Sequence, residues 1–118
     1  MKRFYLTCFI LCIFLIQNFD FKTKASDDLP GKNIFYNSKG KYGSCNHCHR
    51  NGGSAGRWNF TTESIDIEEG RKIPVLKGIG KRKDSDQIER SIHLMQKLFG
   101  FKLTNEQISQ LVEYVGTL

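Results

Sequence analysis

The chain has 118 residues, which suits one small domain. Charged residues make up 25% of the chain and hydrophobic residues 39%, a balance that excludes a disordered tail and a polytopic membrane protein. The formal net charge is +6. Whether this charge points to a binding partner depends on where the charged residues lie along the chain.

The first 25 residues have the pattern of a secretory signal. Two basic residues follow the initiator methionine, and residues 4–16 are then almost wholly apolar. That run is shorter than the roughly 20 residues that a membrane-spanning helix needs, and it matches the apolar part of a signal peptide. Small side chains favour cleavage before Ser26. We expect residues 1–25 to be a signal peptide and residues 26–118 to be one domain exported to the periplasm or an equivalent compartment; retention of the segment would anchor the protein to a membrane.

Cleavage would change the charge balance and leave a small domain. The mature chain keeps 14 basic and 11 acidic residues, so its net charge falls to +3. Nucleic-acid binding needs a concentrated basic face, so we expect no nucleic-acid partner. An apolar core in a chain of about 90 residues is marginal by itself, so we expect a further group to staple the fold.

The mature chain opens with a predicted helix over residues 30–36 and a polar, glycine-bearing loop over residues 37–43, which leads to a cysteine motif. Cys45 and Cys48 are its two cysteines, and His49 follows at once. The resulting C-x-x-C-H string is the sequence form of covalent haem attachment. Two thiols three residues apart can add to the two vinyl groups on one edge of a porphyrin, and the next imidazole can bind the iron. We expect these three residues to hold one haem c.

Three other interpretations of the motif stay open. A disulfide between the two cysteines would close so short a loop that it would stabilise little, and it leaves the histidine unexplained. A redox-active dithiol of the thioredoxin type needs a βαβ context that the sequence does not show. A zinc site would have to recruit His47, His49 or His93, and no second C-x-x-C or H-x-x-x-H spacing is present.

Two amphipathic helices are predicted after a glycine-rich stretch. Residues 50–73 contain four glycines and little periodicity, so we expect a loop wrapped on the haem edge. Asp84, with a glutamine three residues on, caps a helix that Gly100 ends, and Thr104 opens in the same way a helix that Gly116 ends. The apolar stripes of these two helices have the α-helical period and consist of Ile88, Ile92, Met95 and Phe99 in the first and Ile108, Leu111, Val112 and Val115 in the second.

The order of these features resembles the small class I-type cytochromes c that carry a single haem. The resemblance covers most of residues 31–118 and is carried by Gly31–Tyr36, by the C-x-x-C-H motif, by Ile73–Arg82, which is similar to the family's Pro-x-Leu-x-Gly stretch, and by Leu103–Val115. It implies an all-α fold of three to four short helices wrapped around one covalent haem. It also implies an exported one-electron carrier that serves redox partner proteins and transforms no substrate, so no enzyme activity is expected.

The resemblance further implies a methionine as the second axial ligand of the iron. Met95 is the one methionine of the mature chain and follows His49 in the order that the family shows. The family usually places a proline after this methionine, where Gln96 stands here, and Met95 also lies on an apolar stripe, so a core methionine is the alternative. His93 is a further candidate ligand, and a lysine, a side chain of a partner protein or an open position are the remaining alternatives. An open sixth position would indicate gas binding or sensing in place of electron transfer.

Four more residues are expected near the haem. The resemblance implies that the carbonyl of Pro74 accepts a hydrogen bond from the imidazole of His49. Haem propionates need cationic or N–H partners; Arg82 corresponds to an arginine of the family, and Arg57 and Trp58 are further donors. Arg82 and its two lysine neighbours also form a candidate docking patch for an acidic redox partner. The sequence leaves open whether the domain acts alone or as the haem subunit of a larger oxidoreductase.

Overall fold

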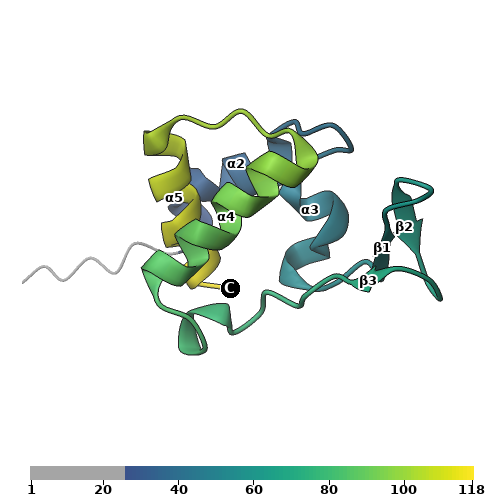
Figure 1. Ribbon diagram of the computed structural model, residues 1–118. Helices are drawn as coiled ribbons and strands as arrows, with labels where there is room; N and C mark the ends of the chain where they lie inside the picture. Colours follow the sequence, from purple (N-terminus) through teal and green to yellow (C-terminus); the bar gives the residue numbers. More distant parts are fainter. Residues whose placement is uncertain (1–25) are drawn as a thin grey trace, which may run out of the picture.

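The computed structural model describes residues 26–118, and the predicted signal segment lies outside that range. Four α-helices form the body of the described domain, and a small sheet extends from one side of it (Figure 1). None of the helices within residues 26–118 is long and apolar enough to cross a bilayer. The elements in chain order are η1 (Ser26–Asp28), α2 (Pro30–Asn37), α3 (Cys45–Cys48), η2 (Arg50–Gly52), β1 (Arg57–Asn59), β2 (Ser64–Asp66), β3 (Arg71–Lys72), η3 (Ile79–Lys81), α4 (Ser85–Phe99) and α5 (Asn105–Gly116).

The longer helices begin at the residues that the sequence indicates. Pro30 is the first residue of α2, where its missing N–H costs no helical hydrogen bond. The side chain of Asp84 accepts from the N–H of Gln87 at 2.8 Å, and the Gln87 side chain accepts from the N–H of Asp84 at 3.1 Å. Thr104 and Gln107 make the same reciprocal pair at 3.2 and 2.9 Å. Both predicted capping boxes are therefore confirmed.

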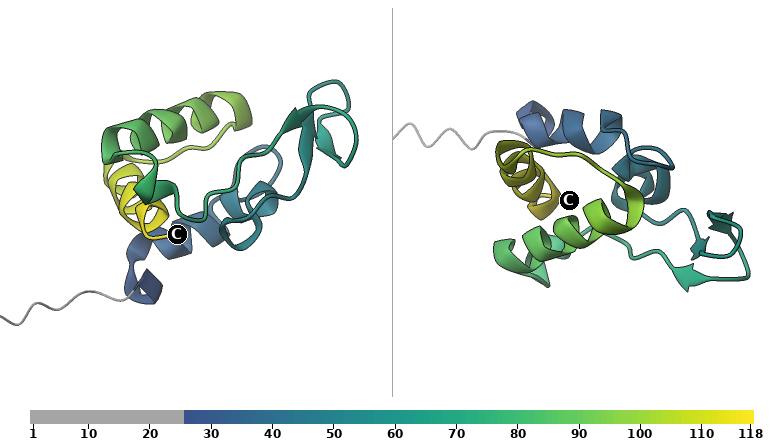
Figure 2. Two further views of the ribbon diagram at one scale, coloured as in Figure 1. Left: turned by 90° about the horizontal axis from the view of Figure 1, so that it is seen from below. Right: turned by 45° about the horizontal axis from the view of Figure 1, so that its top comes forward.

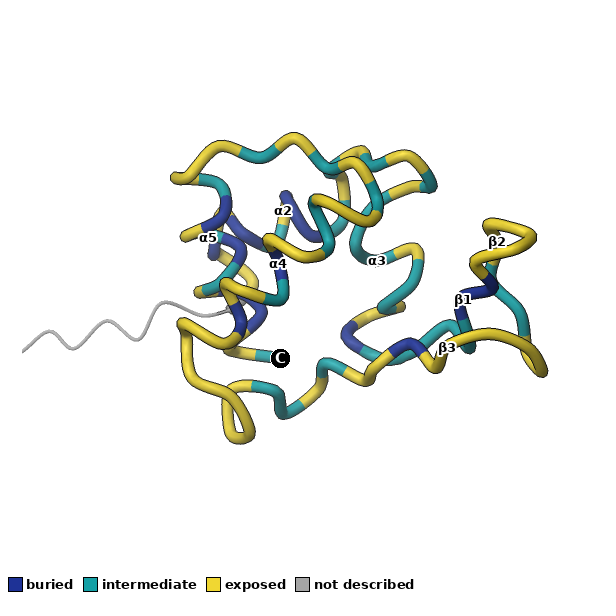
Figure 3. Tube along the Cα trace, viewed as in Figure 1, coloured by how far each residue is buried: buried dark blue, intermediate teal, exposed yellow. Residues whose placement is uncertain are grey.

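The core lies where α5 packs against α2 on one side and against α4 on the other (Figure 2). Gly31 lets α2 and α5 cross closely, because a Cβ at this position would collide with the carbonyl of Gln110. The buried ring of Phe35 then meets that of Tyr114, with their centroids 5.6 Å apart. Buried positions gather along these three helices (Figure 3), and they comprise Leu29, Ile34, Phe35, Ile88, Ile92, Ile108, Leu111, Tyr114 and Val115.

Residues 57–72 form a three-stranded antiparallel sheet, which corrects two expectations. We expected a loop over residues 50–73 and an all-α fold, but β1 lies between β2 and β3 and pairs with both. Trp58 in β1 stands opposite Ile65 in β2 and Arg71 in β3. Strands of two or three residues are too short to show an alternating pattern, so periodicity could not reveal them. The domain is mostly helical with a small sheet.

One aromatic cluster attaches the sheet to the helices. Trp58 is 5% exposed, and the centroid of its ring lies 4.8 Å from that of Tyr42 and 5.3 Å from that of Phe99. Tyr42 belongs to the loop before α3, and Phe99 is the last residue of α4. The buried part of β1 is visible as a short dark segment away from the main core (Figure 3). The sheet is thus anchored by one tryptophan and not by a patterned apolar face.

Candidate functional site

The two cysteines of the motif lie on a single helical turn, α3. The N–H of His49 donates to the carbonyl of Cys45 at 3.0 Å, and residues three positions apart on such a turn share one side of it. Both thiols are free and half-buried. Burial raises the pKa of Cys45 and of Cys48, so both thiols are protonated at neutral pH. Cys45 also packs against the helical core, which fixes the turn to the rest of the domain.

The structure can be compared with what each of the three other interpretations of the motif requires. Within residues 26–118, no three His, Cys, Asp or Glu side chains come together in a way that could hold a metal ion. The two thiols are not joined in a disulfide. The strands are antiparallel, so the described part of the chain has no βαβ unit around a dithiol.

The imidazole of His49 is oriented by residues 73–78, which we call the strap. The strap connects β3 to η3 (Figure 1), and the carbonyl oxygen of Pro74 lies 2.9 Å from Nδ1 of His49. A carbonyl oxygen can only accept, so the proton is on Nδ1 and Nε2 keeps its lone pair. Burial lowers the pKa of His49 despite the opposing effect of this hydrogen bond, so the ring is neutral at neutral pH. A neutral imidazole held in this way is the form that binds a metal.

Backbone hydrogen bonds fix the strap against the end of the motif. The N–H of Gly52 donates to the carbonyl of His49 at 2.9 Å. The carbonyl of Gly52 accepts from the N–H groups of Leu76 and Lys77, both at 2.8 Å. Gly52 has a φ of 79°, in the left-handed region that favours glycine. The Pro74 carbonyl is therefore placed by a framework that starts at the backbone of His49 itself.

The structure separates the three side chains expected to meet haem propionates. Nη2 of Arg82 donates to two carbonyls of the strap at 3.0 and 3.1 Å, so its guanidinium supports the segment that touches His49. Nη1 of Arg57 donates to the carbonyl of Gly70 at 3.0 Å, between β1 and β3. Trp58 is buried in the aromatic cluster described above. Arg82 therefore belongs to the strap, whereas Arg57 and Trp58 organise the sheet.

Met95 and His93 lie on α4 in different surroundings. Met95 is half-buried and is not part of the buried core cluster. The helix flank next to it carries Leu94 and Leu98, which are 51% and 46% exposed. His93 is exposed, and its Nε2 lies 3.5 Å from a carboxylate oxygen of Glu89. The thioether is thus half-buried outside the core cluster, while this imidazole is paired at the surface.

Sequence reasoning missed three polar side chains around the motif. The N–H of Asn51 donates to Oδ1 of Asn46 at 2.7 Å, and the hydroxyl of Tyr36 donates to Oδ1 of Asn51 at 3.1 Å. Asn51 has a φ of 50°, in the left-handed region that asparagine adopts more readily than most residues. An asparagine before two glycines is a readable turn signal. The hydrogen-bond partners of Asn51 could not be predicted from the sequence, because they depend on how α2 and α3 pack together.

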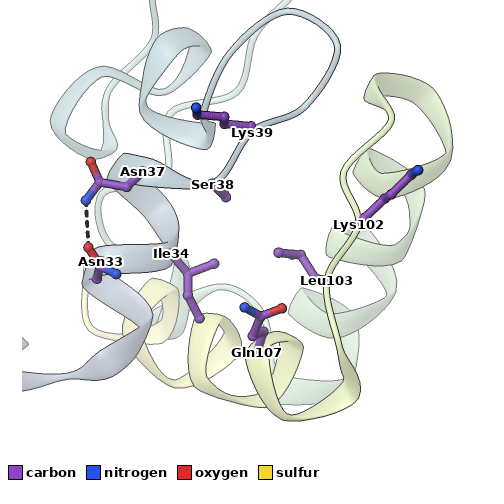
Figure 4. A pocket seen from close by; sticks show the side chains of 8 residues that line it. All are labelled: Asn33, Ile34, Asn37, Ser38, Lys39, Lys102, Leu103 and Gln107. Atoms are coloured by element: carbon purple, nitrogen blue, oxygen red, sulfur yellow. Dashed lines mark hydrogen bonds between the residues drawn. The ribbon is translucent and has the colours of Figure 1, made fainter.

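A surface pocket of about 340 Å³ lies between the end of α2 and the connection from α4 to α5 (Figure 4). None of the residues predicted for the site lines it. One wall approaches the motif, since Oγ of Ser38 lies 3.7 Å from Sγ of Cys45. The pocket is lined by Asn33, Ile34, Asn37, Ser38, Lys39, Lys102, Leu103 and Gln107.

No family model matches this chain, and no curated protein or solved structure matches it either. The functional proposal therefore rests on the chemistry of the side chains described above.

Proposed function

We propose that this chain is a small exported c-type cytochrome with one haem, similar to class I cytochromes c, which carries single electrons between redox partner proteins. One observation carries the proposal. Two free thiols on a single helical turn are followed by a neutral imidazole, whose Nδ1 proton is donated to the carbonyl of Pro74. This donor set fits a haem c, because the thiols suit the two vinyl groups and the free Nε2 suits the iron.

Each residue of the motif would have its own role in holding the haem. Cys45 and Cys48 would hold the haem through thioethers, since addition of a thiol S–H across a vinyl double bond is balanced and needs no oxidant. Nε2 of His49 would be available to the iron, and Pro74 would fix the ring and strengthen it as a donor. When bound, the haem supplies an iron that alternates between the ferric and ferrous states.

Exposed apolar side chains support the presence of a further apolar group. Val75 of the strap is 44% exposed, and Leu94 and Leu98 lie on the flank of α4 beside Met95. Side chains of this kind gain stability when they are covered. A covalently held porphyrin would bring a large apolar surface to a chain whose own core is small.

We propose Met95 as the sixth ligand of the iron. It is the one thioether within residues 26–118, and it is half-buried without belonging to the core cluster. His93 is a weaker candidate because it is paired with Glu89 at the surface. Fast and complete binding of carbon monoxide by the reduced protein would instead indicate an open sixth position and a gas-binding function. Stable co-purification with a catalytic subunit would indicate a component of a larger oxidoreductase.

Covalent attachment is tested by replacing both thiols. The full chain is expressed for export in cells that mature c-type cytochromes, and haem is detected by its peroxidase stain on a denaturing gel. The double variant Cys45→Ala/Cys48→Ala should lose the stain completely, because no thioether can form. His47→Ala is the matched control: this side chain lies between the cysteines and is exposed, so the stain should persist. A stained double variant would refute covalent haem.

A further inference from the structure

We propose that Tyr36, Asn46 and Asn51 form a clamp that positions the imidazole of His49 by fixing the strap. The three are positioning residues, since none of them touches the proposed iron. This inference rests on the proposed function, because it assigns a role to side chains around the proposed iron ligand.

The clamp ties three elements together at the point where the chain leaves the motif. Tyr36 comes from α2, Asn46 from α3 and Asn51 from η2. Asn51 uses its backbone N–H toward Asn46 at 2.7 Å and its side-chain oxygen toward Tyr36 at 3.1 Å. Its φ of 50° and ψ of 36° turn the chain back sharply just after His49. A non-glycine residue in this conformation persists where its surroundings hold it, and the two hydrogen bonds supply that hold.

A continuous series of contacts leads from the clamp to the imidazole. Asn51 is bonded directly to Gly52, whose carbonyl accepts the two strap N–H groups at 2.8 Å. The strap in turn presents the Pro74 carbonyl to Nδ1 of His49 at 2.9 Å. The position of Gly52 therefore decides where the strap lies, and the strap decides how well the Pro74 oxygen meets the imidazole.

The strength of that last hydrogen bond affects the iron. An imidazole that donates a strong Nδ1 hydrogen bond is a better donor through Nε2, and a better donor stabilises ferric over ferrous iron. Loosening the clamp should weaken the hydrogen bond to Pro74. The midpoint potential should then rise, and the Nδ1 proton of His49 should exchange faster with solvent.

The experiment uses the full chain with haem attached and two mild variants. Tyr36→Phe removes one hydroxyl and keeps the ring, and Asn46→Ala removes the acceptor of the Asn51 N–H. The midpoint potential and the exchange rate of the Nδ1 proton are measured, the latter by NMR on histidine labelled with ¹⁵N. Both quantities should increase in both variants, and more in Asn46→Ala, because its hydrogen bond acts on the backbone directly.

The matched control is Asn33→Ala on the same helix as Tyr36. It removes the exposed side-chain hydrogen bond that Asn37 donates to Asn33 at 2.7 Å (Figure 4), and it should move neither quantity. Clamp variants that lose thermal stability but keep the potential and the exchange rate of the wild-type protein would overturn the inference, because the clamp would then be merely structural. A wild-type protein without covalent haem is a separate result: it would refute the proposed function, and the role assigned to the clamp would fall with it.

Discussion

His49 and Met95 are prepared to different degrees for the roles proposed for them. The imidazole of His49 already has its ring neutral, its tautomer set and its orientation fixed by Pro74. Met95 lies in the second-last turn of α4 and is half-buried beside an exposed apolar flank. A thioether is also a soft, neutral ligand with several rotatable bonds. We therefore expect substitutions at His49 and at Met95 to differ in their effects.

Met95→Ala is the test at this position. If Met95 binds the iron, its loss should lower the midpoint potential, because a thioether ligand favours ferrous iron. The weak ferric absorption band that accompanies iron–thioether ligation should vanish as well. Both are measured on the purified protein by spectroscopic redox titration.

Ile92→Ala is the matched control for Met95→Ala. Ile92 lies on the same helix and belongs to the buried helical core, so its truncation should lower stability but leave the band and the potential in place. A Met95→Ala protein with an unchanged spectrum and reduced stability would show that Met95 is a core residue. The loss of stability should then stay at or below the lower end of the roughly 2–5 kcal/mol typical of fully buried sites, because the side chain is only half-buried.

At the scale of elements, α5 is the helix on which the fold depends most. It packs against both α2 and α4, and four of its residues belong to the buried core: Ile108, Leu111, Tyr114 and Val115. Its start is set by the capping box of Thr104 and Gln107. The sheet has no comparable role in the helical core, since Trp58 anchors it to Tyr42 and to the end of α4.

The capping box predicts the effect of Thr104→Ala. Removing the hydroxyl leaves the N–H of Gln107 without its acceptor and should lower the free energy of unfolding by about 1 kcal/mol. Thr104→Ser keeps the hydroxyl and should lose much less. The check is chemical denaturation of the haem-bearing protein, followed by circular dichroism. Equal stability of the two variants would mean that the cap contributes nothing measurable.

At the scale of the whole molecule, positive charge is concentrated in one stretch. Residues 71–83 contain six basic residues and no acidic one. All six are exposed. The ion pairs within residues 26–118 are formed by Lys32, Lys41 and His93, so no cation of this stretch is paired with a carboxylate there. The stretch includes the strap that holds His49. We propose that this basic segment, residues 71–83, attracts anionic redox partners.

Oxidation of the reduced protein by ferricyanide, a small anion, tests this proposal. The second-order rate constant should fall as ionic strength rises, because salt screens the attraction. Lys81→Gln/Lys83→Gln should lower the rate constant at low ionic strength and flatten its salt dependence. Lys39→Gln/Lys102→Gln changes the net charge equally at the pocket of Figure 4 and should have a smaller effect. Equal effects of the two double variants would show that net charge, and not the basic segment, governs the encounter.

The sequence by itself determined the features that depend on neighbours a few residues apart. The two capping boxes and the proline at the start of α2 are short-range patterns, and the structure has them where they were expected. The predicted apolar stripes are buried in part, at Ile88 and Ile92 of α4 and at Ile108, Leu111 and Val115 of α5. The C-x-x-C-H motif was identified from the sequence, but its form, the single turn α3 followed by His49, was not predicted. The resemblance added one contact between residues 25 positions apart, and the hydrogen bond from His49 to Pro74 is present.

Only the tertiary structure decided the rest. The sheet was missed because its strands are too short for a period and depend on Trp58 meeting Tyr42 and Phe99, which are far from it in sequence. The clamp around Asn51 was missed because its donors and acceptors come from α2, α3 and η2. A hydrogen bond between distant residues leaves no trace in local spacing, since either partner could be satisfied by water in another fold.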